Sequence, residues 1–455
     1  MPDQPRIAVG TTQAKSDGTA MLWALMDVFE TAGVRVQQFQ SRAYFPPHEA
    51  ATAITGQSPR HLDSWLMCPD VCRGIFQRGM RASDLALVEG TFVAQSGGTP
   101  TGGSLETLCQ WLDLPRLAIV DVRLLTGCCM PVRPTGVAAL LLDGVGDVRE
   151  ACRWQTHFGA HWNVPVLGWL PALSGLRDQI DRLPSGARPH MDLYHALGQQ
   201  LAAHLQTDRL CQLWENRPMP SVTASDCPLP KRCAPQRDRP LQVAVACDEC
   251  FGGYFPDTLD LLEARGAALC DFSPLRDDRL PPGTDVVYVG CGHPELFAQA
   301  LAGNDCMTLS LKSHLCSGRR IYAECGGLAY LAHEIEMPDG TRWPMVGALS
   351  VTARYNDTPT APEATELTLL ADTWLGESPQ HWRGYLNPHW TIAPHTTTER
   401  SVAEGGHELD VVHCHQAIGS RMYVDFAARQ DLLDRFFEPH HLPPPAANLT
   451  CRGGL

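Results

Sequence analysis

The sequence alternates short apolar segments of strand length with segments of helical spacing along most of its length. The first helical segment, Thr19–Ala32, ends at Gly33, a residue that commonly terminates helices. Apolar strands separated by helices of this kind form parallel sheets that are covered on both faces. The alternation therefore predicts an α/β fold built on a doubly wound parallel sheet. In the first half, the expected strands are Arg6–Val9, Arg35–Phe39, Leu85–Glu89, Leu117–Val122, Gly136–Leu142 and Val164–Trp169.

A proline-rich segment separates this series from a second one. Glu215–Pro240 contains six prolines among polar residues, a composition typical of interdomain linkers. We therefore expect a first domain over residues 1–205, a linker over 206–240, a second domain over 241–440 and a loose tail over 441–455. The expected strands of the second domain are Leu241–Ala246, Ala268–Phe272, Val286–Val289, Arg320–Ala323, Val346–Thr352, Glu366–Leu370, Leu409–His413 and Met422–Phe426.

Charge and composition exclude several classes of protein. The 455 residues include 36 Lys and Arg against 50 Asp and Glu, a formal net charge of −14, with no basic run that would hold nucleic acid. No segment approaches the length of an apolar membrane-spanning helix, and the first ten residues do not resemble an export signal. The 18 cysteines are scattered, which fits reduced thiols. We expect a cytoplasmic protein with no nucleic-acid partner and no membrane association.

Two segments rich in cysteine or histidine leave a metal or redox role open. Cys247 and Cys250 form the one Cys-x-x-Cys pair, without a second pair at zinc-site spacing. His413, Cys414 and His415 are consecutive, and strand geometry would place both histidines on one face with the cysteine opposite. Ordinary surface or core residues explain both segments better, so we assign no metal site.

One turn has the pattern of a catalytic nucleophile. In Ile321–Leu328, an apolar strand runs directly into Glu-Cys-Gly-Gly and then into a helical segment. Glycines after Cys325 permit a sharp strand-to-helix turn, and a helix N-terminus favours the thiolate, which is the arrangement of a nucleophile elbow. A buried structural cysteine is the alternative. A second glycine-rich turn, Gly290–Glu295, follows another strand. The candidate oxyanion-hole donors are the backbone N–H groups of Gly290, Gly292 and Gly326.

Three segments together resemble the cobyrinate a,c-diamide synthase family: Tyr322–Leu328, Gly290–Glu295 and Leu62–Trp65. The resemblance covers nearly the whole chain, with the segments in the family's order. Members of that family join a P-loop domain related to dethiobiotin synthetase to a flavodoxin-like glutamine amidotransferase domain of the class I type. They hydrolyse glutamine, pass ammonia to the first domain, and use ATP to amidate two carboxylates of a corrin or a related tetrapyrrole such as sirohydrochlorin.

The resemblance also implies cofactors, partners and site residues. The cofactors would be ATP and Mg²⁺, and the substrates glutamine and a tetrapyrrole bound in a cleft between the domains. The chain would form a homodimer or act as partner to an intact homologue. Cys325 would be the glutaminase nucleophile, Glu89 the carboxylate near magnesium, and Asp121 ends a strand where the family also has Val-Asp. The candidate substrate-binding residues are Arg42, His48, Asp63, Ser64, Trp65 and Arg383.

The amino-terminal half departs from the family at the phosphate-binding loop. The motif G-x-x-x-x-G-K-[ST] corresponds to Thr11–Thr19, in which Thr19 keeps the magnesium-ligand position. Gly18 stands where the lysine belongs and Asp17 where the last glycine belongs. The missing ammonium removes charge compensation for a transferred phosphoryl group, and Lys15 could supply it only from a rebuilt loop. The candidate nucleotide- and magnesium-binding residues are thus Thr12, Lys15, Gly18, Thr19 and Glu89.

The carboxyl-terminal half lacks the expected general base. Tyr423 occupies the position at which the family has a histidine that takes the proton of the cysteine. Tyrosine, with an ordinary pKa of about 10, is a poor base at neutral pH. His413 and His415 could substitute only if the strand were shifted in register. Of the family's Arg-Gly-His-Glu-Phe-His motif, only Arg383 and Gly384 remain, unless His389 is a counterpart of the motif's histidine displaced by one position.

Three hypotheses follow from these matches and losses. The first is a working ATP- and glutamine-dependent amidoligase acting on a tetrapyrrole, with replacement residues that the sequence does not identify. The second is a catalytically degenerate homologue that serves as a tetrapyrrole-binding carrier, regulator or partner subunit. The third is a cysteine-dependent hydrolase or transferase that does not use ATP. Losses at several independent catalytic positions favour the second.

Overall fold

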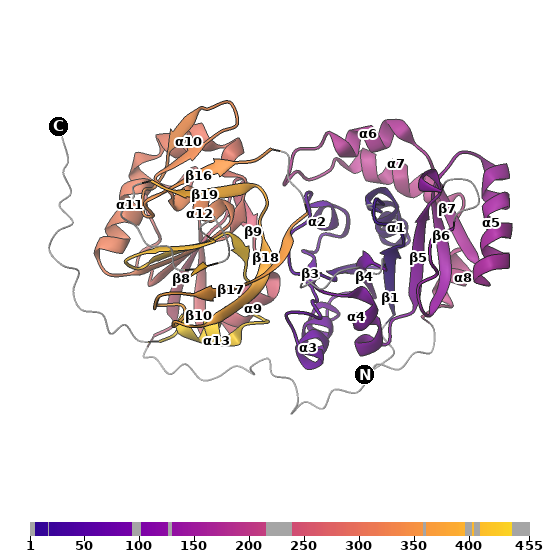
Figure 1. Cartoon of the computed structure of the whole chain (residues 1–455), viewed down its shortest axis with the longest axis horizontal. Helices are drawn as coiled ribbons and strands as arrows, with labels where there is room; N and C mark the ends of the chain where they lie inside the picture. The colour runs from indigo at the N-terminus through magenta and orange to yellow at the C-terminus, as the bar shows by residue number, and fades with distance from the viewer. Residues whose placement is uncertain are drawn as a thin grey trace. The chain divides into compact units, whose positions relative to one another are not determined.

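The chain divides into two compact units, Met1–Leu229 and Pro230–Leu455, which are described separately (Figure 1). The structure is a computed structural model and describes residues 5–16, 18–92, 102–125, 130–214, 239–357, 361–395, 403–404 and 410–438. Both units contain parallel strands connected by helices, so the predicted α/β class is confirmed.

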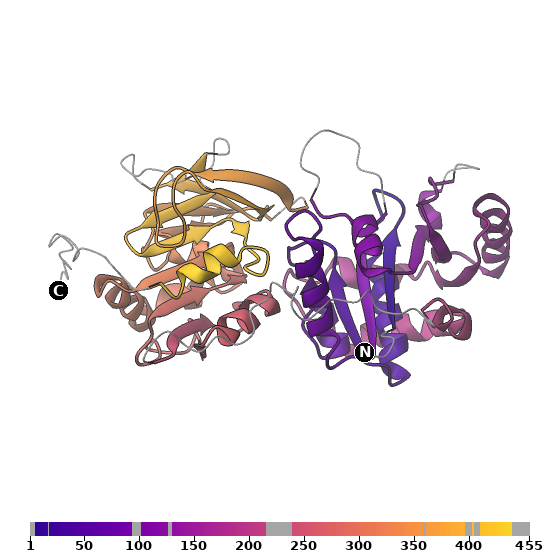
Figure 2. The same ribbon diagram turned by 90° about the horizontal axis from the view of Figure 1, so that it is seen from below.

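A seven-stranded sheet forms the centre of the first unit, and every neighbouring pair of strands in it is parallel. The strand order is β3-β2-β4-β1-β5-β6-β7, and helices lie on both faces of the sheet (Figure 2). Because β1 lies between β4 and β5, the loops that follow these strands meet at one edge of the sheet, where doubly wound folds bind ligands. The strands are β1 (Arg6–Thr11), β2 (Val36–Gln40), β3 (Arg60–His61), β4 (Leu85–Thr91), β5 (Arg116–Asp121), β6 (Val137–Val145) and β7 (Val166–Pro171).

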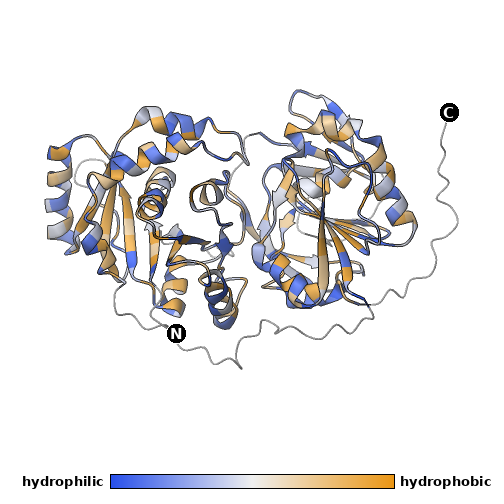
Figure 3. Ribbon diagram, turned by 180° about the vertical axis from the view of Figure 1, so that it is seen from behind, coloured by the Kyte–Doolittle hydropathy of each residue, from blue (hydrophilic) through white to orange (hydrophobic). Residues whose placement is uncertain are grey.

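The helices of the first unit cover a continuous apolar core. Residues of α1 such as Met21 and Leu25 are fully buried and pack with apolar strand residues such as Val9 and Leu141. The hydrophobic residues are concentrated in the strands and the hydrophilic residues on outer helical faces (Figure 3). The helices are α1 (Thr19–Thr31), α2 (Ala50–Thr55), α3 (Pro69–Gly79), α4 (Leu105–Leu112), η1 (Val122–Leu124), α5 (Val148–Trp162), α6 (Ser174–Asp181), α7 (Met191–Ala202) and α8 (Thr207–Cys211).

Helix α8 lies inside the segment that the sequence predicts to be a linker. Its Leu210 is buried, because it belongs to the core of the first unit. A helix of five residues with one buried leucine gives too weak a periodic pattern to be recognised from sequence. Residues 215–238, which include most of the proline-rich segment, lie outside the described residues, as do residues 439–455, which include the whole predicted tail over 441–455.

The second unit is built on a six-stranded sheet with the order β10-β8-β11-β13-β22-β21. All neighbouring pairs are parallel except β21–β22. Strand β22 is absent from the sequence prediction, since Ala417–Ser420 is short and has two apolar residues. The strands of this sheet are β8 (Leu241–Ala246), β10 (Ala267–Phe272), β11 (Val286–Val289), β13 (Arg320–Glu324), β21 (Val411–Cys414) and β22 (Ala417–Ser420).

Smaller sheets and helices complete the second unit. They are the sheets β12-β9, β15-β14-β16-β19 and β20-β17-β18-β23. Their strands are β9 (Phe251–Gly253), β12 (Cys291–Gly292), β14 (Glu334–Glu336), β15 (Arg342–Pro344), β16 (Val351–Tyr355), β17 (Glu363–Leu369), β18 (His381–Leu386), β19 (Trp390–Pro394), β20 (Ala403–Glu404) and β23 (Met422–Tyr423). The helices are α9 (Pro256–Ala264), η2 (Pro294–Leu296), α10 (Ala298–Gly303), α11 (Asp305–Cys316), α12 (Gly326–Leu331) and α13 (Gln430–Arg435). In the described part of the chain, the helices are too short or too polar to cross a membrane.

Candidate functional site

Cys325 lies at a strained turn between β13 and α12, as the sequence predicts. Its φ of 51° and ψ of −109° are unusual for a residue with a Cβ atom, and such backbone strain costs about 1–3 kcal/mol. A Cβ atom on Gly326 would overlap the Gly292 carbonyl oxygen, and one on Gly327 would overlap the Val289 carbonyl oxygen. The two glycines are therefore required because the start of α12 packs directly against the turn after β11. The geometry of a nucleophile elbow is present.

The thiol at this elbow is buried and not activated. Cys325 is 1% exposed, its backbone N–H donates to the Ser420 carbonyl at 2.7 Å, and burial raises the pKa of its thiol. The thiol donates a hydrogen bond to the Arg421 carbonyl oxygen at 3.6 Å and is also in hydrogen-bond contact with the Cys291 thiol and the Asn387 amide. In the described part of the chain no imidazole is among these partners. The arrangement favours a neutral thiol at neutral pH.

The position of the expected base is occupied by a neutral phenol. Tyr423 is 5% exposed, and its hydroxyl accepts a hydrogen bond from the Asn387 amide at 2.7 Å. Burial and the nearby cysteines raise the pKa of Tyr423 well above its ordinary value, so it does not act as a base at neutral pH. His413 lies in β21, and His415 is exposed at a turn with a φ of 52°.

One predicted oxyanion donor is already engaged. The Gly290 N–H donates to the Tyr254 hydroxyl at 2.9 Å, and that hydroxyl donates to the Ala246 carbonyl at 2.6 Å. Gly290 is therefore not a free donor in this structure. Gly292 pairs with Phe251 in the β9–β12 ladder, and Gly326 is the first residue of α12. Their roles as oxyanion donors stay predictions.

The two cysteines of the Cys-x-x-Cys pair differ in exposure. Cys247 is exposed, whereas Cys250 is 2% exposed and burial strongly raises the pKa of its thiol. Within the described ranges, no three side chains of His, Cys, Asp or Glu are grouped so that they could hold a metal ion, and this includes His413–His415.

The loop after β1 in the first unit is fixed by bonds across the sheet. Gly18 is the N-cap residue of α1 and has a φ of 67°, and a Cβ atom there would lie 2.8 Å from Cγ2 of Thr11. A lysine at this position would therefore strain the loop. The Thr12 hydroxyl donates to the Ile119 carbonyl at 3.2 Å, Lys15 is exposed, and Thr19 is the first residue of α1. Asp17 lies outside the described residues.

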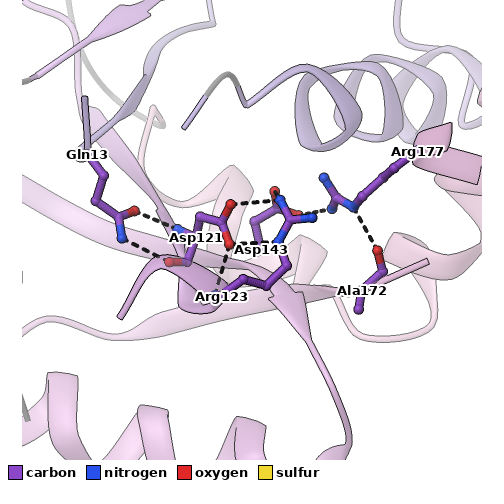
Figure 4. A network of polar contacts seen from close by, with 6 residues as sticks. All are labelled: Gln13, Asp121, Arg123, Asp143, Ala172 and Arg177. Atoms are coloured by element: carbon purple, nitrogen blue, oxygen red, sulfur yellow. Dashed lines mark hydrogen bonds and ion pairs between the residues drawn. The ribbon is translucent and has the colours of Figure 1, made fainter. Parts of the chain in front are cut away.

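An ionic network closes the carboxyl ends of β5 and β6 beside this loop (Figure 4). The Gln13 amide group donates to the Asp121 carbonyl at 2.9 Å and accepts from the Asp121 N–H at 2.8 Å. Arg123 makes two side-chain bonds to the Asp121 carboxylate, at 2.9 and 2.7 Å. The Arg177 guanidinium pairs with the fully buried Asp143 and donates to the Ala172 carbonyl. Many of the polar groups at this edge of the sheet thus have hydrogen-bond or ion-pair partners within the chain itself.

Glu89 lies in β4 near its carboxyl end, paired with Val9 of β1 and Gln40 of β2. Its carboxylate accepts a hydrogen bond of 2.6 Å from the Gln38 amide, and burial raises its pKa to about 7. A carboxylate with this environment can bind a proton or a cation near neutral pH. Its predicted role near magnesium stays a prediction.

Two predicted substrate residues, Asp63 and Ser64, make hydrogen bonds to backbone groups of the first unit. Asp63 is fully buried, and its carboxylate accepts hydrogen bonds from the N–H groups of Ala43, Trp65 and Leu66. The Ser64 hydroxyl accepts from the Ser104 N–H at 2.8 Å. Asp63 therefore forms an Asx turn, and its predicted role in substrate binding stays a prediction. An aspartate whose carboxylate accepts from the N–H two residues further on, as Asp63 does from Trp65, is typical of an Asx turn, and the sequence alone could have suggested it.

The other predicted substrate residues also have partners within the chain. The Arg42 guanidinium donates to the Gly103 carbonyl at 3.3 Å, and Trp65 is partly buried. His48 is partly buried, and its ring makes an edge contact with Trp23. Arg383 lies on β18 and forms an ion pair with Glu366 of the neighbouring strand β17, with 3.2 Å between Nε and Oε2. Arg42, His48, Asp63, Ser64 and Trp65 lie in the first unit and Arg383 in the second.

Comparison with known proteins identifies the class of the second unit and then the family. Residues 242–387 match the family model of the CobB/CobQ-like glutamine amidotransferase domain. This unit is therefore a glutamine amidotransferase-type domain, with Cys325 at its elbow. Along 93% of the chain and 98% of the relative, the sequence is 29% identical to a cobyrinate a,c-diamide synthase of Syntrophotalea carbinolica. A cobyrinate a,c-diamide synthase of Dehalococcoides mccartyi strain CBDB1 is 26% identical over 95% of this chain and 97% of its own.

These matches confirm the predicted resemblance to the cobyrinate a,c-diamide synthase family, and they span nearly the whole chain. Among solved structures, a glutamine amidotransferase crystal structure covers 43% of this chain and 98% of its own, at 16% identity and a TM-score of 0.33.

Proposed function

We propose that the chain is a cobyrinate a,c-diamide synthase-like protein in which ATP- and glutamine-dependent amidation of a tetrapyrrole is lost or strongly impaired. It serves as a tetrapyrrole-binding, regulatory or partner subunit. The observation that carries this proposal is the environment of Cys325. The elbow geometry remains, but the thiol is in hydrogen-bond contact with Cys291 and Asn387. The buried Tyr423 occupies the position at which the proton acceptor is expected. A cysteine nucleophile without a base in hydrogen-bond contact lacks the group that would take its proton and return it to ammonia.

The first unit supports the same proposal independently. The ammonium group that would face a transferred phosphoryl group is replaced by Gly18, in a conformation that disfavours any side chain. Gln13 holds the loop onto Asp121, and Lys15 is exposed. Without a cation at this position, the charge that develops during phosphoryl transfer is not compensated.

A turnover assay tests the proposal directly. The full chain is incubated with Mg²⁺, ATP, glutamine and either cobyrinic acid or sirohydrochlorin, and glutamate and ADP are measured together. We expect no release of either product above the level of a Cys325→Ala variant. A change in the absorption spectrum of the tetrapyrrole upon mixing would support the binding role. Glutamate and ADP released in a fixed ratio that depends on Cys325 would refute the loss of activity.

A second candidate function is that of a cysteine hydrolase or transferase that works without ATP. It is favoured by the strained backbone at Cys325, which the chain retains. This candidate requires a reactive thiol, and the burial of Cys325 argues against one. We expect iodoacetamide at pH 7.5 to alkylate Cys325 at least about tenfold more slowly than the exposed Cys306 of the same chain. Peptide mass spectrometry after timed quenching measures both rates in one digest. Modification of Cys325 faster than Cys306 would favour the hydrolase.

A further inference from the structure

Helix α5 of the first unit carries two histidines one turn apart on one flank. His157 and His161 are separated by four positions, a spacing that places two side chains on the same side of a helix. His161 is exposed and His157 is partly buried. The side chains that α5 buries form a separate apolar stripe: Ala151, Trp154, Phe158 and Trp162. Both imidazoles therefore lie beside the stripe that packs on the sheet, at the outer edge of the first unit (Figure 1).

The two imidazole rings face each other along this flank. Their planes are 14° apart and their centroids 6.4 Å apart, and His157 also contacts the Trp154 ring at 5.8 Å. In the described part of the chain neither ring makes a hydrogen bond, so the ring nitrogens are available as ligands. Imidazole nitrogens bind Zn²⁺ at about 2.0–2.1 Å, so the two rings need to rotate only slightly toward each other to hold one ion.

The charges along α5 are compatible with a bound cation. His161 lies in the last turn of the helix, and the carboxyl end of a helix carries a partial negative charge. Arg153, one turn before His157, donates to the Glu150 carboxylate at 3.2 Å, so a counter-charge already accompanies its guanidinium. The helix itself therefore favours a positive ion at the two histidines.

The pair can be reached by a small ion and leaves room in its coordination shell. His161 is exposed, and His157 lines a cavity of about 330 Å³ together with residues that follow β5, among them Val122 and Leu125. Within the residues that the structure describes, no third side chain of His, Cys, Asp or Glu joins the two histidines. An ion bound here would therefore keep coordination positions for water or for a donor atom of another molecule.

We propose that His157 and His161 bind a divalent transition-metal ion on the flank of α5. Imidazole nitrogen suits Zn²⁺, Ni²⁺ and Cu²⁺, whereas Mg²⁺ and Ca²⁺ prefer oxygen ligands. The spacing of four positions is also that of the two histidines in helical zinc motifs. Because α5 begins after the carboxyl end of β6 and ends before β7 begins, its last turn lies toward the amino ends of the strands, away from the loop after β1. The inference is thus independent of the proposed function.

Amide hydrogen exchange of α5 peptides in the full chain tests the site, with Ni²⁺ as the probe and its Kd measured by calorimetry. An ion held by both histidines stabilises the helical state of the last two turns. At a free Ni²⁺ concentration of about ten times Kd, exchange there should slow by about tenfold. Mg²⁺ at the same concentration should leave exchange unchanged. His161→Asn should abolish the slowing, since it removes one ligand and the two residues have similar helix propensities.

Two matched controls separate this pair from the other histidines of the chain. The double variant Gly159→His, His161→Asn keeps the number of histidines but sets them two positions apart, on different sides of the helix, and should show no slowing. A Cβ atom at Gly159 meets no atom within 4 Å, so this variant should fold. His190→Asn removes a single exposed imidazole, keeps a favourable N-cap for α7, and should respond to Ni²⁺ like the unchanged chain. Exchange in α5 that Ni²⁺ leaves unaltered in the unchanged chain would overturn the proposal, as would equal slowing in the unchanged chain and the double variant.

Discussion

Replacing Arg177 with methionine is expected to destabilise the first unit by about 3–5 kcal/mol. Methionine keeps the length and apolar contacts of the side chain but removes its charge. Asp143, at 0% exposure, would then lose its main ionic partner, since the Arg123 guanidinium lies 4.0 Å away. A buried carboxylate left without its counter-charge is far more costly than the ion pair was favourable. The loss in the free energy of unfolding is measured by amide hydrogen exchange of peptides from β5 and β6 at increasing urea concentrations, in the variant and in the unchanged chain.

An exposed ion pair of the same unit provides the matched control. The Arg35 guanidinium binds the Asp84 carboxylate through two hydrogen bonds, Nε to Oδ2 and Nη2 to Oδ1, each of 2.9 Å. Both side chains are largely exposed. Arg35→Met should therefore have a much smaller effect, because solvent already screens the pair. The double variant Asp143→Leu, Arg177→Met should recover much of the stability, since it buries no charge. Equal losses for Arg177→Met and Arg35→Met would contradict the structural importance of the network.

The sequence predicts the elbow because its cause is local. The turn at Cys325 needs residues without a Cβ atom immediately after it, and those glycines are adjacent in the sequence. The alternation of strands and helices likewise follows from neighbouring residues, so the sheets around β1 and β13 could be predicted. The family resemblance then places each motif on the correct strand.

What surrounds the elbow could not be predicted because it depends on contacts between distant segments. The Cys291–Cys325 contact joins the ends of two strands, and Asn387 reaches the thiol from β18's far end. In the first unit, the Gln13–Asp121 bonds span 108 positions of the chain. The turn that the Asp63 carboxylate completes is local, since its acceptors bind the N–H groups of Trp65 and Leu66, two and three residues further along the chain.

The second unit is expected to lose stability as the pH rises from about 5 to 8, because of Glu324. This residue is 1% exposed, and burial raises its pKa to about 8, with Asp425 nearby also raising it. The hydrogen bond from the Tyr288 hydroxyl, 3.0 Å from Oε1, lowers the pKa only in part. The folded protein thus retains the Glu324 proton over a pH range in which the unfolded chain releases it.

The sign of the effect follows from this difference in proton binding. A raised carboxyl pKa contributes stability that is complete below the unfolded pKa of about 4.3 and is lost as the pH rises through the folded value. The slope is at most about 1.4 kcal/mol per pH unit, so the free energy of unfolding falls by a few kcal/mol between pH 5 and 8. Glu324→Gln keeps the shape and an acceptor for Tyr288 but has no proton to lose. Its stability should therefore depend less on pH.

Urea unfolding of the second unit at half-unit pH intervals, with the variant and the unchanged chain side by side, measures this difference. Relative to Glu324→Gln, the unchanged chain should become progressively less stable toward pH 8. Glu366→Gln, which removes an exposed carboxylate of β17, controls for the change in net charge. Parallel curves for Glu324→Gln and the unchanged chain would mean that Glu324 is ionised in the folded protein. The carboxylate would then lie next to the Cys291 thiol, whose Sγ is 3.9 Å from Oε2, and would oppose thiolate formation at the elbow even more strongly.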